Sequence, residues 1–160
     1  MNADAFRHFY DYHFAENRKI WDMIMSLSQE QFTQPVDYSQ GSIRNQIVHL
    51  ISADNYWFSG LRGVEIPPDF NPADFEDRQR LRAQWDSVEQ TMRDYLANLR
   101  DEMLFEHPLA GGDQVLFLWQ ILLHVGNHGT DHRAQLLRLL NEQGAKTEAQ
   151  DYIFYIFNNL

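Results

Sequence analysis

Apolar residues recur at steps of three and four along four long stretches of this sequence, and this spacing limits the possible folds more than any other feature. Residues at such steps lie on one face of an α-helix. The stretches run over residues 3–27, 43–61, 72–103 and 116–143. Amphipathic helices of this length bury their apolar faces against one another. We therefore expect an all-α fold, a four-helix bundle with a short C-terminal arm, in a single domain over residues 1–160.

Turn-forming and capping residues separate the four stretches. The segment PVDYSQGS (35–42) is expected to be a loop that ends at Ser42, the N-cap of the second helix. Asn71 and Pro72 are expected to cap and begin the third helix, because proline is well suited to the first helical position. Gly144 is expected to end the fourth helix.

Two segments allow more than one interpretation. The loop EHPLAGGDQ (106–114) can include a short extended piece. The aromatic tail AQDYIFYIFNNL (149–160) can form a strand-like arm, a short helix that covers the bundle, or a contact in a dimer. Its spacing does not decide among the three.

The composition excludes several classes of function. The formal net charge is −10, with 13 Lys and Arg residues against 23 Asp and Glu residues. Nucleic acids and anionic membranes bind clustered positive charge, so neither is an expected partner. The chain has no cysteine, so any thiol chemistry needs a thiol from a substrate. We see no signal-peptide pattern, and the most apolar stretch, 115–125, is too short to span a bilayer, so we expect a cytoplasmic protein.

Polar residues interrupt the apolar faces of the first two helices. His13 and Asn17 lie on the seam of the first helix, and His49 and Asp54 lie about midway along the second. Polar groups at core positions need hydrogen-bond partners or a cavity. These positions indicate that something polar lies inside the bundle.

The segment HVGNHGTDHR (124–133) places three histidines four residues apart, at His124, His128 and His132. Two imidazoles at this spacing lie on one helix face and can chelate a single metal ion. A third imidazole from another helix completes a three-histidine set with room for water or substrate, as in catalytic metal sites. His49 is the candidate for that third ligand. We favour His128 and His132 as the pair, because His132 falls on the apolar seam.

The neighbouring residues leave alternatives open. His124 is expected to support a ligand, to line a pocket or to be an ordinary core histidine. Gly129 is expected to open space for a neighbouring backbone, a ligand or a metal. Asp54 is expected either to orient a ligand histidine or to pair with Arg44 or Arg133. In a purely structural interpretation, the histidines of the candidate site are buried and hydrogen-bonded, and the bundle is a dimerising scaffold.

The chain as a whole resembles the DinB/YfiT-like family of damage-inducible four-helix-bundle proteins. The most specific part is LWQILLHVGNHGTDHRAQLLRLL (118–140), which is similar to the family signature HvxNHxxxHRGQ. Ala134 stands where the family usually has glycine. Three further segments resemble the corresponding parts of the family: HFAENRKIWDMI (13–24), IRNQIVHLISADNYWFSGLRG (43–63) and DYIFYI (151–156).

The resemblance implies a divalent metal ion held by His49, His128 and His132, and it also implies a homodimer. Family members with known activity are metal-dependent thiol S-transferases or isomerases that use low-molecular-weight thiols, while many others have no established reaction. Three imidazoles suit Zn, Ni, Fe or Cu, and the sequence does not fix the metal. Because imidazole must lose its proton to bind a metal, occupancy is expected to fall below about pH 6.

We therefore expect a metal-dependent enzyme that activates water or a low-molecular-weight thiol for transfer or hydrolysis of a small-molecule substrate. His13, Asn17 and Tyr56 are the candidate catalytic residues, in the role of orienting groups or proton shuttles. The alternative is a non-catalytic stress protein that binds a metal or a small ligand. Metal-dependent consumption of a thiol and an electrophile distinguishes the two.

Overall fold

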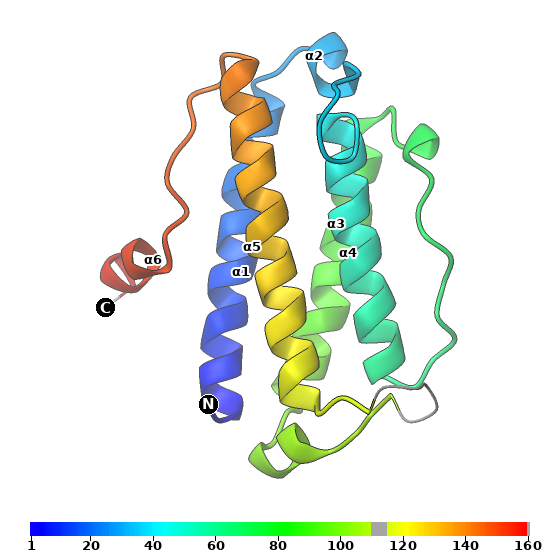
Figure 1. The fold of residues 1–160 in the computed structure, drawn as a ribbon, viewed down its shortest axis with the longest axis vertical. Helices are drawn as coiled ribbons and strands as arrows, with labels where there is room; N and C mark the ends of the chain where they lie inside the picture. The colour runs from blue at the N-terminus through cyan, green and yellow to red at the C-terminus, as the bar shows by residue number, and fades with distance from the viewer. Residues whose placement is uncertain (110–114, 160) are drawn as a thin grey trace.

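Four long helices form the bundle in a computed structural model that describes residues 1–109 and 115–159 (Figure 1). They are α1 (Ala3–Met25), α3 (Ile43–Leu61), α4 (Arg78–Ala97) and α5 (Leu118–Glu142). Two short helices, α2 (Gln29–Thr33) and α6 (Tyr152–Asn158), and two 3₁₀ turns, η1 (Pro72–Asp74) and η2 (Asp101–Phe105), lie between or after them. The described residues contain no strand, which confirms the all-α prediction. Part of the expected loop at 106–114 lies outside them.

Each long helix packs against two others. Helix α5 packs against α1 and α3, and α4 packs against the same two helices from the other side (Figure 1). The seam residues that the spacing predicts on α5 are all buried, among them Leu122, Val125 and Leu136. None of the helices in the described part of the chain is long and apolar enough to cross a membrane.

Helix α3 has the predicted bounds, because its ends carry strong local signals. Ser42 is the N-cap, and its side chain accepts a hydrogen bond from the backbone N–H of Asn45 at 3.1 Å. Helix α5 likewise ends just before Gly144, as predicted. The φ of Gly144 is +82°, a conformation that a residue with a Cβ rarely adopts.

The start of the third long helix was predicted wrongly. Asn71 and Pro72 do form a cap and a first helical position, but they belong to the three-residue turn η1. The chain leaves the helical region at Phe75, and α4 begins at Arg78 behind a second cap, Asp77. Local capping signals fix where a helical turn can start, but they do not fix how long it continues.

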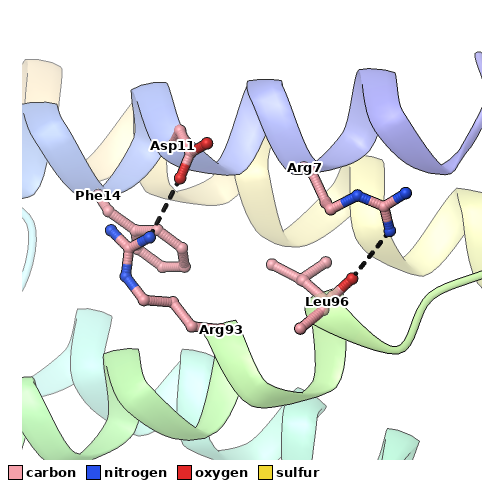
Figure 2. A pocket seen from close by; sticks show the side chains of 6 residues that line it. Arg7, Asp11, Phe14, Arg93 and Leu96 are labelled. Atoms are coloured by element: carbon pink, nitrogen blue, oxygen red, sulfur yellow. Dashed lines mark hydrogen bonds and ion pairs between the residues drawn. The ribbon is translucent and has the colours of Figure 1, made fainter.

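The end of α4 and its position against α1 depend on side chains of α1 (Figure 2). The guanidinium of Arg7 donates to the carbonyl oxygens of Leu96 and Leu99 at 3.1 and 2.9 Å. These bonds satisfy carbonyl groups at the C-terminus of α4. The helix ends at Ala97 and not at Met103, as the spacing had predicted. Arg93 of α4 donates to Asp11 at 3.1 Å. A cavity of about 140 Å³ lies between these groups, and both arginines that line it are already bonded.

The C-terminal tail forms a short helix, one of its three predicted alternatives. The ring of Tyr152 on α6 packs edge-on against Tyr12 at 5.0 Å between centroids. The preceding residue Gln150 binds α1, because its backbone oxygen accepts from the Tyr12 hydroxyl at 2.7 Å. Phe154 and Phe157 remain exposed on the outer face of α6. Helix α2, which the spacing did not predict, lies at one end of the bundle (Figure 1).

Candidate metal centre

Three imidazole rings from two helices face one another between α3 and α5. They belong to His49 of α3 and to His128 and His132 of α5, and one ring nitrogen from each lies within 4.8 Å of the other two. Nε2 of His49 is 3.3 Å from Nε2 of His128. Two nitrogens that bind one zinc ion tetrahedrally at about 2.0–2.1 Å are separated by about 3.3 Å. We call these residues the three-histidine cluster.

The local sequence explains why the rings converge. His128 and His132 are one helical turn apart on α5, so their rings lie side by side with centroids 4.2 Å apart. Helix α3 packs along α5 and brings the ring of His49 to 4.6 Å from that of His132. The structure thus brings together the three residues that the sequence nominated.

The environment of the cluster favours neutral imidazoles. Burial is the first cause that lowers the pKa of His128 to about 4, and the nearby His132 and His49 lower it further. Burial and His49 also lower the pKa of His132. Neutral imidazoles have a free lone pair, which a transition metal needs. Three such donors suit a divalent transition metal and leave a coordination position open.

A buried carboxylate lies beside the cluster without a hydrogen-bond partner. Asp54 is 1 % exposed, and neither of its oxygens accepts a hydrogen bond from any described residue. Its charge opposes the lowering of the pKa of His128. A buried anion in this position is better tolerated when a cation is nearby. Asp54 therefore fits a metal ion in the three-histidine cluster.

A second polar group lies deeper in the bundle, and we call it the interior cluster. It contains His13, Asn17, Asp54 and Arg133. The Arg133 guanidinium donates to Nδ1 of His13 and to Oδ1 of Asn17, both at 3.1 Å. Nε2 of His13 faces Asp54 Oδ2 at 3.7 Å. Burial lowers the pKa of His13, and the Asp54 carboxylate opposes this effect.

Several predictions about the neighbouring residues need correction. Asp54 faces His13 and does not pair with Arg44 or Arg133. The space that Gly129 opens is filled by a side chain, because a Cβ there would lie 2.4 Å from Cε1 of His13. Gly129 is thus required for the interior cluster and does not admit a ligand.

The candidate catalytic residues lie in different environments. His13 is fully buried and Asn17 is 2 % exposed, and both bind Arg133 rather than line a cavity. Tyr56 is 43 % exposed on α3, where its ring contacts Trp57 edge-on. His124 is exposed and packs against Trp57 at 5.1 Å, which places it beside the cluster rather than in the core.

A small polar cavity opens beside His49. Its volume is about 200 Å³, and it lies between the face of α3 that carries Asn45, His49 and Ser52 and the loop at Asp69 and Phe70. The backbone N–H of Phe70 donates to Ser52 Oγ at 3.0 Å, which holds the loop over the helix. This cavity can admit a small molecule next to a predicted ligand.

Gln46, which the spacing did not single out, contacts the cluster from behind. Gln46 lies one turn before His49, is fully buried, and contacts the ring of His132 through its side-chain amide. A polar residue next to the apolar face of the second helix was the only available signal. Its partner lies 86 residues away in the sequence, so spacing along one helix did not reveal the contact.

Comparison with known proteins gives a consistent result. The family described as "DinB family" matches residues 1–159. The chain is also similar to "Protein DinB" of Bacillus subtilis (strain 168), with 25 % identity over 171 aligned positions. That alignment covers 98 % of this chain and 96 % of the relative.

Proposed function

The chain belongs to the DinB family, and from this premise we propose that it is a metal-dependent enzyme that activates water or a low-molecular-weight thiol for transfer or hydrolysis. The observation that carries the proposal is the convergence of three imidazole nitrogens within 4.8 Å of one another. His49, His128 and His132 are the proposed ligands, and the metal is Zn, Ni or Fe. When bound, a divalent cation would lower the pKa of a water or thiol beside it, so that a nucleophile exists near neutral pH.

The residues around the cluster support a small substrate. The cavity beside His49 is about 200 Å³, which is enough for part of a small molecule. Its lining includes the carboxylate of Asp69 and neither Lys nor Arg, so it favours a neutral or cationic polar group over an anionic one. Because the chain has no cysteine, a reacting thiol has to come from a cosubstrate.

We further infer that the protein acts in the cytoplasm as a homodimer and that nucleic acids and membranes are not its partners. The net charge of −10 supports the second point. The exposed Phe154 and Phe157 on α6 offer an apolar surface that a second copy of the chain can cover. Light scattering of the untagged protein tests the dimer.

An activity assay with untagged protein tests the central proposal. The protein is stripped of metal and reloaded with Zn, Ni or Fe, and the consumption of a thiol and an electrophile is followed. The proposal predicts turnover that depends on metal and is lost in His49→Ala. Stoichiometric metal without turnover on a panel of thiols and electrophiles would contradict it.

One observation favours a non-catalytic alternative, a stress protein that binds a metal or a small ligand. Two of the three candidate catalytic residues, His13 and Asn17, are buried and bonded inside the bundle. Tyr56 then remains as the candidate proton shuttle. The alternative predicts that a small ligand raises the melting temperature in a saturable manner while no product forms.

A further inference from the structure

The side-chain amide of Gln46 lies behind the three-histidine cluster and is fully buried. Its nitrogen is 2.5 Å from Nδ1 of His132 and 3.0 Å from Oε1 of Gln135. Its oxygen accepts a hydrogen bond from the hydroxyl of Ser39 at 2.7 Å and one from the backbone N–H of Gln40 at 3.3 Å. Gln46 therefore connects a predicted ligand to the loop before α3.

This contact determines which nitrogen of His132 faces the cluster. Because Gln46 occupies Nδ1, Nε2 is the atom that remains to face His49 and His128. A neutral imidazole carries one proton, on either Nδ1 or Nε2. For Nε2 to bind a cation, that proton has to lie on Nδ1, and a buried N–H at Nδ1 needs an acceptor.

Gln46 can supply that acceptor without a change in the fold. A half-turn of its terminal amide exchanges the oxygen and the nitrogen in nearly the same positions. The Ser39 hydroxyl can then accept the hydrogen bond that it donates in the present arrangement. The Gln135 amide can turn as well and donate where it now accepts, which gives up its exposed hydrogen bond to Asp131 Oδ2. The long bond from the backbone N–H of Gln40 at 3.3 Å is also given up. The turned orientation therefore exchanges two hydrogen bonds at the edge of the site for one to the buried Nδ1 of His132.

We propose that Gln46 is a positioning residue, whose amide oxygen accepts the Nδ1 proton of His132 and so keeps Nε2 of that ring free for the metal ion. The inference rests on the proposed metal site. Groups that hold the second nitrogen of a ligand histidine typically change metal affinity by about 10–100-fold when they are removed. A carboxylate at this position would accept the same proton.

Zinc affinity, measured by competition with a chromophoric chelator, tests the proposal on three variants. Gln46→Met keeps the side-chain volume but removes the amide, and we expect it to weaken zinc binding about 10–100-fold. Gln46→Glu keeps an acceptor, and we expect its affinity to equal or exceed that of the wild type. Gln150→Met is the matched control. Its amide binds Arg133 and the backbone of Glu16 but no predicted ligand, so zinc affinity should not change.

A second measurement determines which ring nitrogen of His132 carries the proton. In zinc-loaded protein with ¹⁵N-labelled histidine, we expect the long-range ¹H–¹⁵N spectrum to place the proton of His132 on Nδ1. A His132 bound to zinc through Nδ1, or Gln46→Met with wild-type affinity, would overturn the role of Gln46 while leaving the metal site intact. A wild-type protein that binds no zinc would overturn both proposals. If Gln46→Met does not fold, the spectrum and Gln46→Glu still decide.

Discussion

Two clusters of polar residues that contain histidine lie next to each other in this bundle. They differ in the kinds of groups that face one another. In the three-histidine cluster, like groups face one another, with the Nε2 atoms of His49 and His128 3.3 Å apart and no carboxylate or arginine of the described residues bonded to them. In the interior cluster, a donor faces acceptors, since Arg133 donates to His13 and Asn17. Neighbouring residues of α5, His132 and Arg133, belong to different clusters.

The difference indicates which cluster is a site. Buried polar groups in a protein interior normally find partners of the opposite kind, as His13 and Asn17 do in Arg133. Nitrogens that converge on one another could hold a metal ion that the chain itself does not supply. The same residue type therefore has an arginine partner at His13 and two other imidazoles beside it at His128, and only the surroundings distinguish the two.

The largest expected effect comes from removing a ligand. We predict that His128→Ala abolishes stoichiometric zinc binding while the protein stays folded, because two remaining imidazoles from two helices bind a cation far more weakly. Metal analysis after dialysis measures the effect. His124→Ala is the matched control, since His124 lies on the same helix outside the cluster. An unchanged metal content in His128→Ala would contradict the proposal that the three-histidine cluster, and not the interior cluster, binds the metal.

The next effect concerns the interior cluster, where a substitution should change stability rather than zinc binding. We predict that Arg133→Met lowers the free energy of unfolding by about 3 kcal/mol, because His13 and Asn17 lose a buried donor and Asp54 loses a nearby positive charge. The zinc affinity of the folded protein should change little. Urea denaturation and chelator competition measure the two quantities. A variant that loses zinc but keeps its stability would show that the clusters are not independent.

A smaller effect is expected at Gly129, where the ring of His13 packs against α5. A Cβ at residue 129 would lie 2.4 Å from Cε1 of His13, and overpacking of this kind costs about 1–3 kcal/mol. Helix propensity offsets about 1 kcal/mol of that cost. We therefore predict that Gly129→Ala is modestly destabilising in thermal unfolding. In a His13→Ala background the same change should become stabilising, and a clash that persisted there would refute the contact.

A further effect is a pH dependence of the metal-free protein. Folding lowers the pKa of His13, His128 and His132, that of His128 to about 4, so the unfolded chain binds more protons between about pH 6.5 and 4. The free energy of unfolding should therefore fall as the pH drops through this range. His128→Ala should weaken the dependence. Urea midpoints that stay constant from pH 7 to 4 would contradict it.

The same pKa values refine an expectation from the sequence. Ordinary imidazoles predict loss of metal below about pH 6. Because the pKa of His128 is about 4, that ligand remains unprotonated at a pH where a free imidazole is charged. Zinc should accordingly be retained to a pH lower than the sequence alone suggests, which a titration with a metal indicator measures.

Features of the fold that depend on neighbouring residues could be predicted from the sequence. The bounds of α3 follow from the cap at Ser42 and from regular apolar spacing, and the pair His128 and His132 follows from one helical turn. Helix α2 could not be predicted in this way, because its five residues are too few to show a period.

Contacts between distant parts of the chain could not be predicted from the spacing, apart from the meeting of His49 with His128 and His132, which the family resemblance also implied. The partner of Gln46 lies on another helix, and so does the His13 ring that fills the space at Gly129. An arginine partner was one of two alternatives for Asp54, because charge pairing is the usual solution for a buried carboxylate. The packing of α1 places His13 in front of it instead. Such contacts depend on how helices pack, which the spacing within one helix does not contain.

Zinc-edge X-ray absorption, combined with anomalous diffraction from untagged protein loaded with one equivalent of zinc, tests the central claim most directly. The account predicts one ion per chain, bound to imidazole nitrogens of His49, His128 and His132 at about 2.0–2.1 Å. An ion bound at other residues, or no ion retained at all, would contradict it.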